Sequence, residues 1–185
     1  MSKKTLGILV GSLRRDSLSK KVALYLGNLL EERFDVSFLN IASLAIYNQD
    51  LDNEADIPQE WLRFREEVKA LDAVLFVTPE YNRSMPPVLK NALDIASRPM
   101  ASNSWKGKPG AVVSVSPGGV GGFSANHHLR QSAACLNIYM MPQPEAYLGN
   151  IAGSLDADGV SDKRTQDFLS KFADAFSDWV HKLTK

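Results

Sequence analysis

The sequence has 185 residues, of which 44% are hydrophobic, and this length and composition are typical of one domain with a sizeable core. Basic and acidic residues both number 21, so the net charge is zero and nothing indicates a face for nucleic acid. Cys135 is the only cysteine, which excludes an internal disulfide, and no apolar run could span a bilayer. The run after Lys4 is also too short for a signal peptide. We expect a cytoplasmic single domain over residues 1–185 without nucleic-acid or membrane partners.

The first half of the chain predicts three strands and two helices. Continuous apolar runs over residues 5–10, 36–39 and 73–77 are typical of strands that are covered on both faces. Leucine and valine at helical spacing predict a helix after residue 17, with Ser17 as its N-cap. A polar stretch over residues 47–58 predicts a loop, and apolar residues between 61 and 71 predict the second helix.

The second half continues the alternation of strands and helices. Pro86 and Pro87 suit the first turn of a helix, and residues 111–115 predict the fourth strand. A helix over about 124–136, a strand over 138–141 and a strongly amphipathic last helix follow. This order predicts an α/β fold, namely a flavodoxin-like doubly wound sheet of five parallel strands with helices on both faces.

The loop over residues 11–19 lies between a strand and a helix N-terminus, where free amides and the helix dipole favour an anion. Its serine hydroxyls, with Arg14 or Arg15, add donors that suit a phosphate. The loop has neither the GxxxxGK[ST] spacing of a nucleoside-triphosphatase loop nor the GxGxxG dinucleotide fingerprint. The alternative is a polar loop that Ser17 caps, with solvated arginines.

The loop over residues 78–87 offers an aromatic face at Tyr81 and, at Asn82, an amide that both donates and accepts. Open α/β sheets bind ligands at the carboxyl ends of their strands, and these groups suit a flat heteroaromatic ring. Glu80 either contacts the ligand, ties the loop down or reaches across a subunit boundary. The alternative is a proline-rich turn in which Asn82 serves the backbone conformation.

The loop over residues 116–122 contains four glycines, which let a backbone approach a ligand closely. Its amides would stabilise negative charge on a reduced heterocycle. Taken alone, the pattern favours a flexible turn. The pattern indicates a ligand site only together with the two loops above, since neighbouring strands of such a sheet end at the same edge.

Together these loops resemble the NAD(P)H-dependent FMN reductases of the flavodoxin-like class, a group that includes bacterial quinone, chromate and azo-dye reductases. The resemblance is carried by Gly11-Ser12-Leu13-Arg14 with Ser17, by Thr78-Pro79-Glu80-Tyr81-Asn82 with Leu89-Lys90-Asn91-Ala92-Leu93-Asp94, and by Ser116 with its glycine loop. It implies FMN and NAD(P)H as cofactors, small-molecule electron acceptors, and a homodimer or homotetramer.

The resemblance also implies which residues bind FMN. The phosphate would lie on Ser12, Arg14, Ser17 and Ser19, and the ring on Pro79, Glu80, Tyr81 and Asn82, with Ser116 and Gly119 at its pyrimidine side. Two positions depart from the commonest pattern of the family. Relatives often have Asn where Ser19 stands, and Arg83 stands where many have an aromatic or other residue, so that an arginine at the rim could attract the second phosphate of the dinucleotide.

The implied function is an FMN-dependent oxidoreductase that takes hydride from NAD(P)H and reduces quinones, azo compounds, chromate or free flavin by a ping-pong mechanism. Because the flavin carries the chemistry, no side chain is named as catalytic. The alternative is a non-enzymatic flavodoxin-like electron carrier, but such proteins are usually strongly acidic, and the zero net charge and Arg14 argue against it.

A hydrolase is a further alternative, and a G-x-S-x-G elbow is missing from the sequence. His127 and His128 are adjacent, so on a helix they point in different directions and make a poor metal pair. Cys135 lies in an apolar helical stretch, which predicts a core residue rather than a nucleophile.

Overall fold

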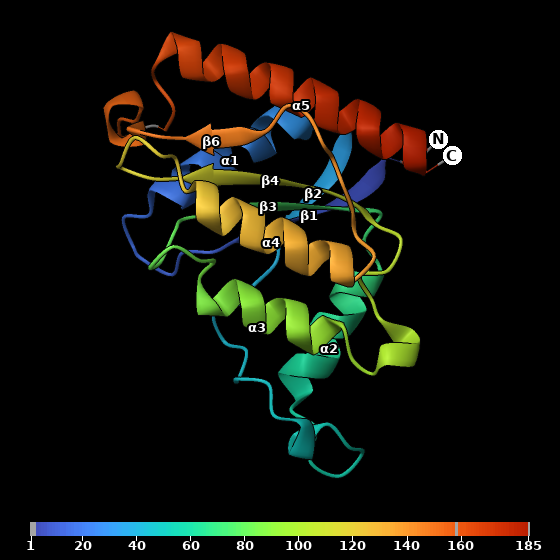
Figure 1. The fold of residues 1–185 in the computed structure, drawn as a ribbon. Helices are drawn as coiled ribbons and strands as arrows, with labels where there is room; N and C mark the ends of the chain where they lie inside the picture. The colour runs from blue at the N-terminus through green and yellow to red at the C-terminus, as the bar shows by residue number, and fades with distance from the viewer. Residues whose placement is uncertain (1–2, 158, 185) are drawn as a thin grey trace.

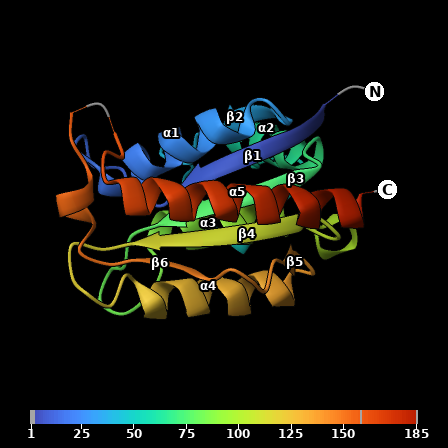
Figure 2. The same ribbon diagram turned by 90° about the horizontal axis from the view of Figure 1, so that it is seen from above.

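A parallel sheet forms the middle layer of the molecule (Figures 1 and 2), and the computed structural model describes residues 3–157 and 159–184. Its strands are β1 (Lys4–Val10), β2 (Phe34–Phe38), β3 (Ala73–Thr78), β4 (Pro109–Val115), β5 (Tyr139–Met140) and β6 (Ala146–Leu148). The order across the sheet is β2-β1-β3-β4-β5, and β6 also pairs with β4. The predicted flavodoxin-like topology is therefore confirmed.

Helices cover both faces of the sheet, as predicted (Figure 1). They are α1 (Leu18–Leu30), α2 (Gln59–Lys69), α3 (Pro87–Ala96), α4 (Phe123–Cys135) and α5 (Lys163–Leu183), with short 3₁₀ turns at Gln49–Leu51, Met100–Ser102 and Ile151–Ser154. One core cluster lies between the sheet and α1 with α5, and it includes Phe172 and Phe176. The second lies between the sheet and α2, α3 and α4, around Trp61, Phe64 and Trp105.

The fifth position of the sheet is divided, which the sequence did not predict. β5 pairs with Pro109 and Gly110 at the start of β4, whereas β6 pairs with Val113 to Val115 at its end. Between them lie Pro142 and Pro144, which have no N–H to donate to a strand ladder. Over the described residues, the sheet therefore has six strands in five positions.

Local signals set the helix ends as expected. Ser17 caps α1, since its Oγ accepts a hydrogen bond from Lys20 N (3.0 Å), and Pro87 is the first residue of α3. Asp162 caps α5 by accepting from Thr165 N (2.8 Å). These caps fix where each helix begins, and for α1 that point lies directly after the loop of residues 11–17.

The prediction that Cys135 belongs to the core is wrong, because the residue is exposed. The helix α4 buries the face formed by Ala125, Asn126, Leu129 and Ala133. Cys135 follows Ala133 by two positions, which turns it by about 200° around the helix, towards solvent. Within the described part of the chain, no helix is long and apolar enough to cross a membrane.

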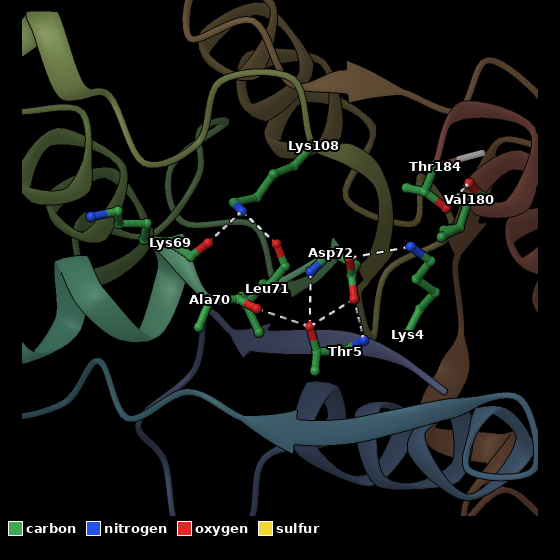
Figure 3. Close-up of polar contacts among 9 residues, drawn as sticks. All are labelled: Lys4, Thr5, Lys69, Ala70, Leu71, Asp72, Lys108, Val180 and Thr184. Atoms are coloured by element: carbon green, nitrogen blue, oxygen red, sulfur yellow. Dashed lines mark hydrogen bonds and ion pairs between the residues drawn. The ribbon is translucent and has the colours of Figure 1, made fainter. Parts of the chain in front are cut away.

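The amino end of the sheet is closed by polar contacts (Figure 3). Thr5 N donates to Asp72 Oδ2 (2.8 Å), and Asp72 N donates in return to Thr5 Oγ1 (2.9 Å). Lys108 Nζ donates to the carbonyls of Lys69 and Leu71, where α2 ends. Burial lowers the pKa of Lys108, and the charge of Asp72 partly offsets that shift. The polar groups at this end therefore form hydrogen bonds with one another and with the backbone.

Candidate functional site

A cavity of about 220 Å³ lies at the carboxyl end of the sheet, among the loops that follow β1, β3 and β4. Its lining consists of Ser12, Arg14, Ser17, Leu18, Ser19, Pro79, Glu80, Tyr81, Val115, Ser116 and Pro117. The predicted site residues thus meet here, except Asn82 and Gly119, which do not line the cavity. Leu18, Val115 and Pro117 were not predicted. A wider groove of about 590 Å³ runs beside α4 and α5, but its lining contains no hydroxyl cluster of this kind.

Three serine hydroxyls of the cavity are held by the backbone. Ser17 Oγ accepts from Lys20 N (3.0 Å), Ser116 Oγ from Gly118 N (3.0 Å), and Ser12 Oγ, more weakly, from Arg14 N (3.4 Å). A hydroxyl whose oxygen accepts from the backbone still has its own proton to donate. The loops therefore fix the positions of oxygens whose protons can point to a ligand.

The loop that begins at Gly11 lies close to α3, and the absence of a side chain on Gly11 makes this possible. A Cβ on Gly11 would lie 2.6 Å from Leu89 Cδ1 and 3.2 Å from Pro79 Cδ. Gly11 N also donates to Val77 O (2.9 Å), which joins the ends of β1 and β3. Leu89, in the helix that follows the second loop, thus brings the first and second loops together.

Asn91, also in α3, holds the loop that precedes α2. Its Oδ1 accepts from Tyr47 N (2.8 Å), and its Nδ2 donates to Ala45 O (3.0 Å). The side chain is 8% exposed, so these hydrogen bonds hold the loop before α2 in a largely buried place. The stretch from Leu89 to Asp94 therefore supports the site without lining it.

Glu80 ties the second loop down, one of the roles considered for it. Its Oε2 accepts from Ala125 N (3.1 Å), in the first turn of α4, and its Oε1 lies 3.5 Å from Arg83 Nη1. A carboxylate at a helix N-terminus is favoured by the unpaired amides and the dipole. Because Gly122 precedes α4 and has no side chain, Glu80 supplies the cap from a distant part of the sequence.

The second loop closes as a tight turn. Tyr81 N donates to Ser84 O (2.9 Å) and Ser84 N donates to Tyr81 O (3.0 Å). Asn82 and Arg83 between them have φ values of 50° and 66°. Asparagine tolerates this left-handed backbone, which agrees with the backbone role considered for Asn82. Tyr81 remains 42% exposed at the mouth of the cavity.

The glycine loop is held by β6 and by the residues directly after it. Ser116 N donates to Leu148 O (2.9 Å), and Asn150 N donates to Gly118 O (3.2 Å). Gly121 has a φ of 66°, and a Cβ there would lie 2.6 Å from the backbone of Tyr147. This support from residues 146–151 was not predicted from the sequence.

A buried polar chain holds the loop from the other side. Ser114 Oγ donates to Gly121 O (2.7 Å), and Asn126 Nδ2 donates to Ser114 Oγ (3.3 Å). Arg130 Nε donates in turn to Asn126 Oδ1 (2.9 Å). Both Ser114 and Asn126 are fully buried. The spacing of Asn126 and Arg130 by four residues on a helix was a signal that could have indicated this pair.

The two adjacent histidines point to different partners, as predicted. His127 Nε2 lies 3.0 Å from the hydroxyl of Tyr147, and His128 Nδ1 lies 3.0 Å from Ser84 Oγ. Burial, together with a hydrogen bond to Glu145, raises the pKa of Tyr147 to about 12, so its phenol keeps its proton at neutral pH. In the described part of the chain, no group of three or more His, Cys, Asp or Glu could hold a metal ion.

These groups fit a flavin mononucleotide. The N-terminus of α1, the hydroxyls of Ser12 and Ser17, and Arg14 favour a phosphate on one side of the cavity. Pro79, Tyr81 and Val115 give the other side an apolar and aromatic lining for a ring system. Ser116 also lines the cavity, at the start of the glycine loop, and adds a hydroxyl donor.

Comparison with known proteins agrees with this chemistry. Residues 4–153 match the family model described as NADPH-dependent FMN reductase. A quinone reductase of Pseudomonas putida is 48% identical over 176 residues, 95% of this chain and 94% of that protein. A 2-hydroxy-1,4-benzoquinone reductase of a Burkholderia species is 43% identical, over 95% of each chain. The solved structure of FerB, a flavoenzyme NAD(P)H:(acceptor) oxidoreductase of Paracoccus denitrificans, has a TM-score of 0.91 at 45% identity and covers 97% of this chain and 98% of its own.

Proposed function

The chain belongs to the NADPH-dependent FMN reductase family and is an NAD(P)H-dependent FMN oxidoreductase; from that premise we propose that it reduces quinones with FMN held in the cavity at the carboxyl end of the sheet. The FMN phosphate lies at Ser12, Arg14, Ser17 and Ser19. The ring lies against Pro79, Glu80, Tyr81 and Asn82, with Ser116 and Gly119 at its pyrimidine side.

One observation carries this assignment, namely that a single cavity gathers hydroxyls, a cation and an aromatic face from three separate loops. Ser12 and Ser116 come from loops more than a hundred positions apart in the sequence, yet both oxygens are held by a neighbouring backbone N–H. Fixed donors of this kind stabilise charge without having to reorganise. The quinone reductases among the relatives support quinones as acceptors.

The side chains of this protein bind FMN, orient it and shield it from solvent. When bound, FMN supplies a ring that can accept hydride from NAD(P)H and pass electrons to an acceptor. Tyr81, at the mouth, offers a flat face to whatever enters, and the glycine loop offers amides to negative charge. Tyr147 holds its proton firmly, so it does not act as a base at neutral pH.

Donor and acceptor use the same opening in turn, which predicts ping-pong kinetics. An open, flat surface of this kind also accommodates azo compounds and free flavin. We expect the enzyme to reduce chromate as well. No acid or base from the protein is required for these reactions, and therefore no catalytic side chain is assigned.

We expect the enzyme to work in the cytoplasm as a homodimer or homotetramer. Exposed apolar side chains at the carboxyl end, Leu13, Val120 and Phe123, support the idea that a second copy covers this region. Sedimentation of the FMN-loaded protein tests the assembly: a dimer or tetramer supports it and a monomer at micromolar concentration contradicts it.

An anaerobic absorbance titration tests the function. The FMN-loaded protein is titrated with NADPH, and separately with NADH, while the visible flavin band is followed; benzoquinone is then added. The proposal predicts prompt bleaching and full recovery of the band on adding the quinone. Bound FMN that neither donor bleaches would instead support an electron carrier, and the absence of FMN binding would overturn the assignment of the cavity.

A further inference from the structure

Arg83 lies in the turn at the mouth of the cavity, in a backbone conformation that side chains rarely adopt. Its φ is 66°, next to Asn82 at 50°. Glycine or asparagine is easier to accommodate in left-handed backbone than arginine. Residues in such conformations cluster at active sites and ligand-binding positions, where the surrounding structure holds them in place despite the strain.

The charge of Arg83 is only loosely engaged within the protein. Its side chain is 73% exposed, and its ion pair with Glu80 is long, at 3.5 Å. Glu80 is held much more firmly, since its side chain is 14% exposed and its other oxygen accepts from Ala125 N. Arg83 can therefore turn towards a ligand while Glu80 stays in place as the cap of α4.

The two arginines near the cavity divide the anion-binding work. Arg14 lines the cavity beside the N-terminus of α1, where the FMN phosphate is assigned. Arg83 does not line the cavity and lies two positions after Tyr81. It can therefore bind an anionic group of a second ligand while the FMN phosphate occupies the cavity. Glu80 lines the same mouth, so without Arg83 its carboxylate would repel phosphate.

We propose that Arg83 binds the adenosine 2′-phosphate of NADPH and so sets the preference for NADPH over NADH. The inference rests on the proposed function and adds that the dinucleotide passes over the turn of residues 81–84 when its nicotinamide reaches the flavin ring. A phosphate monoester carries a charge of about −1.5 to −2 at pH 7, and the planar guanidinium donates to it through two parallel hydrogen bonds. NADH lacks this group.

Calorimetric titration of the FMN-loaded protein with 2′,5′-ADP and with 5′-AMP measures the contribution of the 2′-phosphate directly. Arg83→Gln should weaken binding of 2′,5′-ADP about ten-fold and binding of 5′-AMP less than two-fold, as expected for the loss of one charge-assisted contact. Arg83→Lys should fall between, because lysine keeps the charge but not the planar pair of donors.

Arg63→Gln is the matched control. Arg63 is also an exposed arginine with a 3.5 Å ion pair, to Glu67 on α2, and it does not line the cavity. We expect no change in either titration. Arg83→Asn serves as a second variant, because asparagine removes the charge and tolerates the left-handed backbone, so its result separates charge from folding.

Steady-state kinetics give the second readout. The ratio of kcat/KM for NADPH to that for NADH should fall about ten-fold in Arg83→Gln, mainly through KM for NADPH. Equal binding of 2′,5′-ADP and 5′-AMP by the parent, an equal loss for both ligands in Arg83→Gln, or an unchanged ratio overturns the proposal. If neither donor reduces the bound flavin, the proposed function fails, while calorimetry still decides the role of Arg83.

Discussion

The two ends of the sheet use polar residues in opposite ways. At the amino end, Thr5 and Asp72 donate to and accept from each other, and Lys108 donates to backbone carbonyls (Figure 3). At the carboxyl end, the oxygens of Ser12 and Ser17 accept from the backbone while their protons remain available. A polar group that is satisfied within the protein contributes to stability, whereas a fixed group with a remaining donor is ready for a ligand.

This contrast predicts which property each end controls. Changes at the amino end should lower the free energy of unfolding and leave FMN affinity alone. Changes to Ser12 and Arg14 should do the reverse, because Ser12 Oγ accepts a weak hydrogen bond, from Arg14 N at 3.4 Å, and contributes little to the fold. Changes to Ser17 should lower both stability and FMN affinity, because Ser17 also caps α1. Substitutions in the glycine loop should lower both the free energy of unfolding and the FMN affinity, since there the fold and the site depend on the same backbone atoms.

Gly121→Ala should have the largest effect. The new Cβ would lie 2.6 Å from Tyr147 C and 2.7 Å from Tyr147 O, and the φ of 66° is unfavourable for alanine. Backbone cannot move aside as a flexible side chain can, so we expect a loss of about 3 kcal/mol in the free energy of unfolding. Urea denaturation measures this loss, and FMN affinity should fall with it.

Gly153→Ala is the control for this substitution. A Cβ at Gly153 would meet nothing within 4 Å, so the unfolding midpoint should stay close to that of the parent. If Gly121→Ala were as stable as Gly153→Ala, the packing described for the glycine loop would be wrong.

Asp72→Asn should lower stability without affecting FMN. Burial alone would raise the pKa of Asp72, but hydrogen bonds from Thr5 and the charge of Lys4 outweigh it and lower the pKa. The carboxylate therefore stabilises the fold at pH values above its unfolded pKa of about 4, and this contribution is lost as pH falls through the lower folded pKa. Because the side chain is 35% exposed, we expect a loss of about 1 kcal/mol at pH 7.

Denaturation at several pH values checks the sign. The difference between Asp72→Asn and the parent should be largest near neutral pH and should shrink below about pH 4. A difference that grew as the pH fell would contradict this explanation of the amino end.

Glu80 combines a structural role with a place in the site, since it caps α4 and also lines the cavity, and its conservative substitution should have the smallest effect. Glu80→Gln keeps an acceptor for Ala125 N but loses the charge, so we expect about 0.5 kcal/mol of destabilisation. Glu80→Ala removes the cap and should cost about 1 kcal/mol. Thermal unfolding of both variants tests this order, and equal stability of Glu80→Ala and the parent would rule out the capping role.

The sequence predicted what depends on neighbours along the chain. Ser17 caps α1 through a residue three positions away, and Pro87 suits the first turn of α3 because its ring fixes φ and it has no N–H to leave unpaired. The cavity residues could be found because parallel strands end at one edge, which brings their loops together whatever the details of packing. That rule placed Ser12 and Ser116 in one site without any knowledge of their contacts.

Contacts between distant segments could not be predicted in this way. The hydrogen bond of Glu80 to α4 spans 45 positions, and no local pattern marks its partner. The buried pair of Ser114 and Asn126 depends on how α4 lies on β4, which weak amphipathic patterning left undetermined. The exposure of Cys135 depends on the same rotation of α4.

Titration of the FMN-free protein with FMN, followed by flavin fluorescence, tests the central claim most directly when Arg14→Gln and Asp72→Asn are compared with the parent. We predict that Arg14→Gln raises the FMN dissociation constant by about ten-fold or more, as expected for the loss of a charge-assisted contact to phosphate. Asp72→Asn should bind FMN like the parent despite its lower stability. Unchanged affinity in Arg14→Gln, or equal weakening in both variants, would contradict the assignment of FMN to the carboxyl end.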